Sequence, residues 1–124
     1  MRLVAPFHWI GDAATAAVAL LHVYFLVLEM FFWDKPLGRR VFGLTPEFAQ
    51  ASKTLAANQG LYNGFLAAGL FWGVAHGAAG LSIKAFFLGC VVVAGVFGGI
   101  TANGRIFWVQ AVPGAMALAL VLLQ

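Results

Sequence analysis

The chain has 124 residues, of which 63% are hydrophobic and only 9% are charged. Soluble domains carry about 25% charged residues, so this composition cannot supply a water-facing surface. The net charge of +3 is spread over the connecting segments and lacks the basic patch of a nucleic-acid-binding protein. We therefore expect an integral membrane protein whose surroundings are the lipid bilayer, with no nucleic-acid partner.

Four apolar stretches are long enough to cross a bilayer, which takes about 20 residues of helix. They cover residues 13–33, 54–75, 83–102 and 106–123. Because unpaired backbone groups cannot face lipid, each stretch is expected to be helical. The run Thr45-Pro46-Glu47 has the residue types of a helix start, so the second helix is expected to begin near Pro46.

The connections between these stretches predict their arrangement. Residues 76–82 and 103–105 are short connections, which make the helices they join antiparallel neighbours, whereas 34–53 is long. The sequence thus predicts an all-α membrane protein with a single transmembrane domain, residues 1–124. Its four antiparallel helices would lie at about 13–33, 46–75, 83–102 and 106–123 and form a bundle.

The distribution of basic residues predicts the orientation. The first and third connections hold Lys35, Arg39, Arg40, Lys53 and Arg105, while the opposite side holds Arg2 and Lys84. Cytoplasmic loops are enriched in Lys and Arg. Both termini are therefore expected outside, with the first and third connections in the cytoplasm.

Glu29 is the carboxylate that lies inside a predicted spanning stretch. An ionisable side chain at that depth costs roughly 2.5–3.5 kcal/mol on insertion-based scales, so it is usually retained for a ligand, a pathway or a partner. Glu29 is therefore the first candidate site residue. Two structural alternatives stay open, because its side chain could snorkel to the interface or pair with Arg105 at a similar depth.

Other polar residues lie at a matching depth. Counted from the predicted cytoplasmic ends, polar side chains of all four helices fall in one band about 6–8 Å below the interface. His22 lies deeper and shares a helix face with Glu29, and Gln59 is expected to share one with Asn63. No comparable set is expected in the outer half. The candidate ligand-binding residues are His22, Glu29, Trp33, Asn58, Gln59, Tyr62, Asn63, Thr101 and Gln110.

These residues also have a structural interpretation. Amides in membrane helices commonly hydrogen-bond across a bundle and contribute about 0.6 kcal/mol each, and a buried histidine commonly packs in the same way. Taken together, one acid, one imidazole and several amides favour a pocket for the hydroxyl, amine or carbonyl group of a small amphiphile.

Glycines recur four residues apart at Gly60/Gly64, Gly69/Gly73, Gly73/Gly77 and Gly95/Gly99. This spacing gives smooth helix faces on which backbones approach closely. Packing inside one bundle, a homodimer and the lining of a pocket would all use such faces.

No metal or cofactor is expected. The histidines His8, His22 and His76 lie on different levels, and Cys90 is alone, so no metal-ligand spacing exists. Nucleophilic catalysis has no serine inside a spanning stretch to carry it. Proton transfer stays open, with Glu29 and His22 as the candidate catalytic acid and base.

Three strings, LHVYFLVLEMFFWDKPLGRRVFGL, LAANQGLYNGFLAAGLFWG and AGVFGGIT with a later VQAVPGAMAL, resemble domain of unknown function family 1304. The resemblance spans nearly the whole chain and implies a small four-helix membrane protein, expected in a bacterial inner membrane. Its recurrent positions would fall here on His22, Glu29, Trp33, Pro36, Asn58, Gln59, Gly60, Asn63, Gly64, Thr101 and Gln110. Members are often labelled "epimerase", but the resemblance implies no activity.

The sequence therefore predicts a membrane protein that binds, and in one variant moves, a small lipophilic or cationic molecule, with Glu29 as the charged anchor. A membrane isomerase or proton-transfer enzyme acting on a lipid-like substrate, with Glu29 and His22 as acid and base, is the first alternative. An accessory structural subunit is the second.

Overall fold

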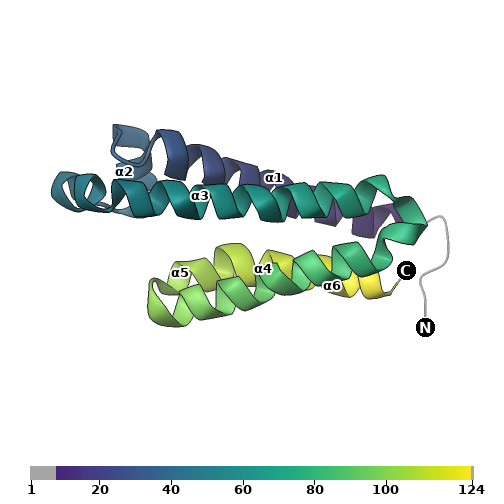
Figure 1. Cartoon of the computed structure of the whole chain (residues 1–124). Coiled ribbons are helices and arrows are strands. Elements are labelled where there is room, and N and C mark those ends of the chain that lie inside the picture. The colour runs from purple at the N-terminus through teal and green to yellow at the C-terminus, as the bar shows by residue number, and fades with distance from the viewer. Residues whose placement is uncertain (1–7, 124) are drawn as a thin grey trace. The chain divides into compact units, whose positions relative to one another are not determined.

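The computed structural model describes residues 8–123, and this part of the chain is helical, with no strand. The expected all-α class is confirmed. The elements in chain order are α1 (His8–Phe31), α2 (Pro36–Phe42), α3 (Pro46–Ala75), the 3-10 turn η1 (Gly77–Gly80), α4 (Leu81–Thr101), α5 (Gly104–Ile106), the π-helical turn η2 (Phe107–Ala111) and α6 (Val112–Leu122), as Figure 1 shows.

The described residues divide into two compact units. The α2 unit comprises residues 20–67, which are the second half of α1, all of α2 and most of α3. The α4 unit comprises residues 8–19 and 68–123, which are the start of α1, the end of α3 and every later element. The helices α1 and α3 therefore contribute to both units.

Three segments of residues 8–123 are long and apolar enough to cross a membrane, namely His8–Phe31, Gly77–Thr101 and Gly104–Leu122. The helix α3 has 30 residues, which is length enough. However, Lys53 and the amides Asn58, Gln59 and Asn63 make α3 more polar than these three segments. The expected count of four spanning helices therefore stays a prediction.

The start of α3 follows from its first residues. The helix begins at Pro46, and the backbone N–H of Phe48 donates to Thr45 Oγ1 at 3.1 Å. Thr45 thus caps one of the N–H groups that the first turn leaves without a partner, as the sequence indicated. Glu47 lies in the same turn, where its charge complements the helix dipole.

A short helix, α2, lies in the connection that sequence reasoning left without an element. Pro36 lies in its first turn, where a backbone N–H is not needed, and Gly43 ends it with φ of 66°, a left-handed conformation that favours glycine. Gly38 faces the end of α1, because a Cβ there would collide with the carbonyl of Phe32. Its seven residues are too few for a hydrophobic period to predict.

Gly60 and Gly64 allow α1 and α3 to approach each other within the α2 unit. A Cβ added at Gly60 would lie 2.7 Å from Met30 Cγ and 3.0 Å from Glu29 Cβ, and one at Gly64 would lie 2.6 Å from Leu26 Cδ1. Gly60 lies near Met30, whereas Gly64, later on α3, lies near Leu26, earlier on α1. The two helices are therefore antiparallel here. The close-packing role predicted for this glycine pair is confirmed.

The last helix of the α4 unit is irregular, whereas one regular helix was expected. In η2 the backbone N–H of Val112 bonds to the carbonyl of Phe107, five residues back. Pro113 follows directly, and a widened turn accommodates a residue that lacks an N–H and whose ring crowds the carbonyl four residues earlier. Here the backbones of η2 and α4 meet, because a Cβ at Gly95 would collide with Ala111.

One predicted glycine pair, Gly73/Gly77, does not form a packing face. A Cβ at Gly73 would lie 2.6 Å from Lys84 Cγ, but nothing surrounds Gly77 within 4 Å. Gly77 instead has φ of 59° and turns the chain between α3 and α4. The prediction failed because spacing alone does not show where a helix ends.

Candidate functional site

Glu29 and Asn63 are the two candidate residues that the structure brings into direct contact. The Asn63 Nδ2 group donates a hydrogen bond to Glu29 Oε1 at 2.6 Å. Asn63 is 4% exposed, whereas Glu29 is half-buried. Both residues belong to the α2 unit, Glu29 on α1 and Asn63 on α3, so the contact joins the two helices.

Asn63 reaches Glu29 because it lies on the buried face of α3. The buried residues of this part of α3 are Ala56, Gly60, Asn63 and Ala67, at spacings that define one helix face. The small neighbours draw α3 against α1, and Asn63 is the polar member of the face. Gln59, which was expected to share this face, is exposed.

The pair retains two acceptor atoms. Glu29 Oε2 and Asn63 Oδ1 accept no hydrogen bond from residues 8–123, and neither of them is a fully buried atom. A carboxylate oxygen beside an amide oxygen selects a hydrogen-bond donor, and a cationic donor gains most because the bond is charge-assisted. The chemistry of the pair therefore fits an ammonium group.

His22 lies on α1 and is completely buried. Its ring meets Phe25 edge to face, with 5.5 Å between ring centroids and 73° between ring planes. At 1.5 Å per residue His22 lies about 10 Å along the helix axis from Glu29. The imidazole and the carboxylate are therefore about two helical turns apart on α1.

Trp33 lies directly after α1 and joins three elements of the α2 unit. Its Nε1 donates to Ser52 Oγ on α3 at 3.0 Å. Its ring lies 4.9 Å from that of Phe42 at the end of α2. These contacts make Trp33 a packing residue at the corner where α1, α2 and α3 meet.

The other α3 candidates point away from the buried face. Asn58, Gln59 and Tyr62 are exposed, and their side chains make no hydrogen bond with residues 8–123. The Tyr62 ring lies 6.1 Å from that of Phe65. The structure therefore does not add these three residues to the Glu29–Asn63 pair.

The remaining candidates, Thr101 and Gln110, belong to the α4 unit. Thr101 ends α4 and is exposed, and its Oγ1 donates to the carbonyl of Phe97 at 2.7 Å. Gln110 is buried within the π-helical turn η2. Turns of this kind often mark functional positions, and Gln110 is the polar side chain that this one buries.

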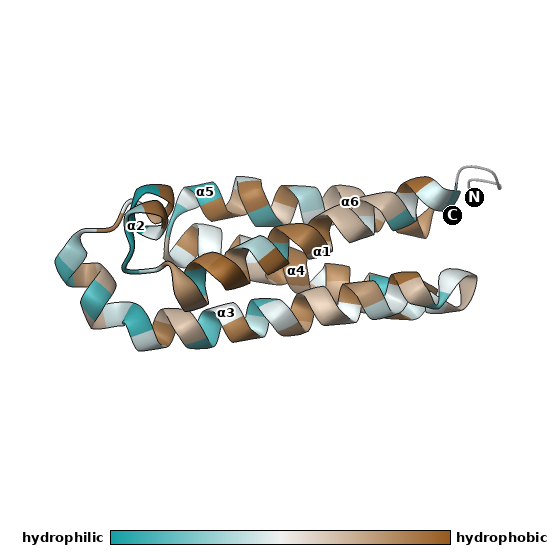
Figure 2. Cartoon of the chain, turned by 90° about the horizontal axis from the view of Figure 1, so that it is seen from above, coloured by the Kyte–Doolittle hydropathy of each residue, from teal (hydrophilic) through white to brown (hydrophobic). Residues whose placement is uncertain are grey.

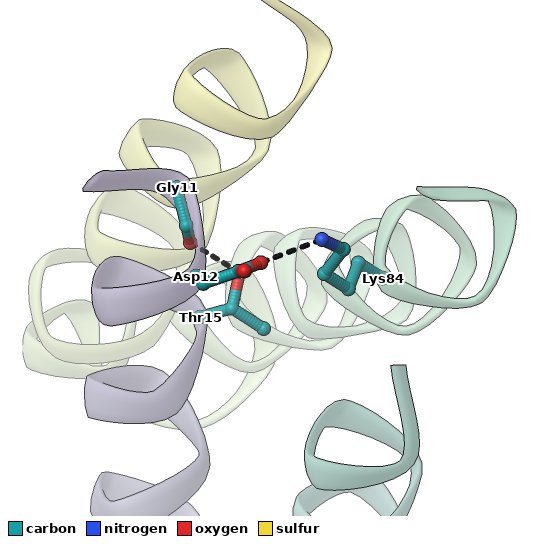
Figure 3. Close-up of polar contacts among 4 residues, drawn as sticks. All are labelled: Gly11, Asp12, Thr15 and Lys84. Atoms are coloured by element: carbon teal, nitrogen blue, oxygen red, sulfur yellow. Dashed lines mark hydrogen bonds and ion pairs between the residues drawn. The ribbon is translucent and has the colours of Figure 1, made fainter. Parts of the chain in front are cut away.

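A buried ion pair in the α4 unit was missed by sequence reasoning. Lys84 Nζ lies 2.6 Å from Asp12 Oδ1, as Figure 3 shows. The Lys84 side chain is 4% exposed and that of Asp12 is 26% exposed. Beside the pair, the buried Thr15 donates from Oγ1 to the carbonyl of Gly11 at 2.7 Å.

This pair corrects two expectations. Lys84 was counted only as one of the basic residues that indicate orientation, and the outer half was expected to carry no polar set comparable with that around Glu29. Asp12 and Lys84 are 72 positions apart in the sequence, so no local spacing predicts their contact. A usable signal was present, however, because an acid and a base stand at the ends of two apolar stretches on the same predicted side of the membrane.

The described residues offer no metal site, and the hollow found among them does not include Glu29. Within residues 8–123 no three His, Cys, Asp or Glu side chains lie together as a metal ion would require. An open, apolar hollow of about 640 Å³ lies along one face of α4, lined by Ala85, Phe86, Gly89, Cys90, Val93, Ala94 and Phe97. Its lining has no charged group, so it does not belong to the Glu29 site.

Comparison with known proteins gives a family but no activity. The family model described as "Protein of unknown function (DUF1304)" matches residues 16–122. The "Uncharacterized protein YpaA" of Lactococcus lactis subsp. lactis (strain IL1403) is 33% identical over 106 residues, which cover 84% of this chain and 87% of that protein. No solved structure matches the chain.

Proposed function

The chain belongs to the DUF1304 family of proteins of unknown function, and from its own residues we propose that it binds a small lipophilic amine at Glu29. The observation that carries this proposal is the hydrogen bond of 2.6 Å from Asn63 to Glu29, in a helix apolar enough to cross a membrane. The amide orients the carboxylate but does not neutralise it. A cationic ligand would supply the missing charge.

The ligand class follows from the atoms that stay open. Glu29 Oε2 and Asn63 Oδ1 would accept the N–H groups of a protonated amine, while the apolar side chains of α1 and α3 would accept its hydrocarbon body. Leu26 and Met30 lie on α1 where α3 approaches most closely. Movement of the ligand across the membrane would use the same site.

An enzyme is the second candidate, with Glu29 and His22 as acid and base. Both residues lie on α1, and the buried imidazole is the observation that favours this alternative. Acid and base must each lie within hydrogen-bond reach of the reacting atoms. Their separation of about 10 Å along the helix exceeds that reach for one small reacting group, so binding ranks first.

An accessory subunit ranks third. The glycine faces that would dock a second protein or a second copy are used inside the chain, since Gly60 and Gly64 pack on α1 and Gly95 packs on η2. These contacts remove the sequence argument for a homodimer. The exposed side chains Asn58, Gln59 and Tyr62 are among the polar groups that a partner would still find on α3.

The proposed topology has four spanning helices and both termini outside, with α2 on the cytoplasmic side of a bacterial inner membrane. The support is the cluster of basic residues in and around α2. A reporter that is active only in the cytoplasm should be active when inserted near Gly43 and silent when fused after Gln124. The opposite pattern would move the Glu29 site to the outer leaflet.

The binding proposal predicts selective stabilisation by lipophilic amines. The purified full chain would be titrated with a series of alkylamines and with the matching alcohols and carboxylic acids, while its thermal unfolding is followed. A ligand present at 100 times its Kd stabilises by about 2.7 kcal/mol, so binding is readily measured. The amines should stabilise the protein. Glu29→Gln should raise their apparent Kd by tenfold or more.

Glu47→Gln is the matched control, because it makes the same chemical change at an exposed residue in the first turn of α3. This variant should keep the full amine response. Equal responses from Glu29→Gln and Glu47→Gln, or equal stabilisation by amines and alcohols, would reject Glu29 as the anchor. Mass spectrometry of molecules that co-purify with the protein would then identify the natural ligand.

A further inference from the structure

Three cations at α2, namely Lys35, Arg39 and Arg40, form no salt bridge among residues 8–123, and Lys35 interacts with the neighbouring Asp34 only through its charge. Lys35 precedes the helix, and Arg39 and Arg40 lie in its last turn. The nearby Asp34 is already paired with Lys53, at 3.1 Å between Nζ and Oδ2. Among residues 8–123, no acid forms an ion pair with any of the three cations of α2.

Arg39 holds a donor that the protein leaves unused. Its Nε is buried and has no hydrogen-bond partner among residues 8–123, and no other buried side-chain nitrogen or oxygen in this part shares that condition. The two Nη groups of Arg39 also have no hydrogen-bond partner among residues 8–123, but they are not fully buried, so an acceptor from outside the chain can reach the guanidinium there. A guanidinium forms bidentate hydrogen bonds with a phosphate or a carboxylate.

Packing contacts hold both ends of α2, the helix that carries Arg39. The start of α2 packs on the residue after α1 through the close approach of Gly38 to Phe32. The end of α2 packs on Trp33 through the ring of Phe42. Because both ends are held, the backbone from which the Arg39 side chain projects has a defined position. In a flexible loop, by contrast, the backbone that carries an arginine would have no fixed position.

Apolar side chains are exposed beside these cations. Leu37 on α2 is exposed, as are Phe31 and Phe32 at the end of α1. Figure 2 shows hydrophilic residues gathered at α2 and at the start of α3, in contrast to the apolar helix α1. Cations next to exposed apolar side chains, at the end of a helix of spanning length, fit the boundary between headgroups and acyl chains.

We propose that α2 binds the phosphate group of an anionic phospholipid, with Arg39 as its bidentate ligand and with Lys35 and Arg40 adding charge. The apolar neighbours Phe31 and Leu37 favour a lipid over free phosphate, because they would contact its acyl chains. The site is separate from Glu29 and does not depend on the ligand proposed there.

Lipid titration of the full chain tests this assignment. Detergent-solubilised protein would be mixed with phosphatidylglycerol or phosphatidylcholine, and the bound lipid counted by native mass spectrometry. We expect phosphatidylglycerol to bind more tightly. Arg39→Gln should weaken its binding about fivefold, the change expected for one basic residue at an anionic surface. The affinity of Arg39→Lys for phosphatidylglycerol should lie between those of the parent and Arg39→Gln, because lysine keeps the charge but cannot form the bidentate hydrogen bonds of a guanidinium.

Arg105→Gln is the control, since it removes the same charge from the α4 unit. It should leave the lipid preference unchanged. Equal weakening by Arg39→Gln and Arg105→Gln, or equal binding of the two lipids, would overturn the proposal. If Arg39→Gln fails to fold by circular dichroism, Arg39→Lys carries the comparison alone.

Inorganic phosphate distinguishes a lipid site from a free-anion site. Added to lipid-free protein, it should bind far more weakly than phosphatidylglycerol. Binding of inorganic phosphate as tight as that of the lipid, and dependent on Arg39, would show that the acyl chains contribute nothing. That result would overturn the assignment to a lipid.

Discussion

The two units each place a carboxylate of α1 against a polar side chain of another helix, but they balance it differently. In the α4 unit Asp12 meets the ammonium of Lys84, and the two charges cancel. In the α2 unit Glu29 meets the neutral amide of Asn63, which supplies no opposite charge. The distances are equal, at 2.6 Å, so the difference lies in the chemistry of the partner.

This difference separates a structural role from a binding role. A buried pair of opposite charges needs no ligand to balance it, and removing one partner lowers the stability of the fold. A carboxylate held by one amide is oriented but uncompensated, which is a state that a cationic ligand would relieve. Asp12 therefore has the environment of a clamp between helices, whereas the environment of Glu29 fits the anchor proposed above.

The largest expected effect comes from removing one partner of the Asp12–Lys84 pair. Asp12→Asn should destabilise the protein by about 3–5 kcal/mol, because it strands a buried ammonium. Lys84→Met should cost less, since the side chain of Asp12 is 26% exposed and water can reach it. Glu29→Gln, in contrast, should leave the ligand-free protein equally or more stable. Unfolding in mixed detergent micelles measures all three variants.

The double variant Asp12→Asn/Lys84→Met completes the comparison. It should recover most of the stability lost in Asp12→Asn, because no charge is left without a partner. Simple addition of the two single effects would show that the residues act independently, and the clamp would be rejected. A loss of about 3 kcal/mol for Glu29→Gln would likewise make Glu29 a structural residue.

Much of the fold could be predicted because the determinants are local. Composition predicts helices, and the cap at Thr45 together with Pro46 locates the start of α3. The irregular elements could not be predicted in the same way. The helix α2 is too short to show a period, and the π-helical turn η2 depends on Pro113 together with the contact between Gly95 and Ala111.

The candidate site could be predicted only in part. The sequence included Glu29 and Asn63 among its candidate ligand-binding residues, and the structure joins these two. Rotation about the helix axis was not readable, because Gln59 and Asn63 fit one face by spacing although only Asn63 is buried. Pairing across 72 residues, as between Asp12 and Lys84, depends on which helices become neighbours, and that is a property of the folded chain.

A third carboxylate, Asp34, extends the comparison to an ion pair with a solvent-exposed lysine. It pairs with Lys53 at 3.1 Å, as Asp12 pairs with Lys84, but the Lys53 side chain is 51% exposed. The hydrogen bond from Lys53 holds the pKa of the Asp34 carboxyl below its usual value. This pair has the charges of the Asp12–Lys84 pair, but its lysine is exposed where Lys84 is buried, so water and salt should weaken it.

The smallest effect is therefore expected from Lys53→Gln. A depressed pKa means that the pair contributes above the ordinary aspartate pKa of about 3.9 and that its contribution is lost as pH falls through the lowered value. The unfolding midpoints of the parent and Lys53→Gln should differ slightly at pH 7 in dilute salt, and should coincide near pH 2 or in about 1 M salt, where the Debye length is about 3 Å. The Asp12→Asn effect at pH 7 should persist in that salt, because Lys84 is buried. If salt erased both effects alike, burial would not distinguish the two ion pairs, and the contrast between clamp and surface contact would fail.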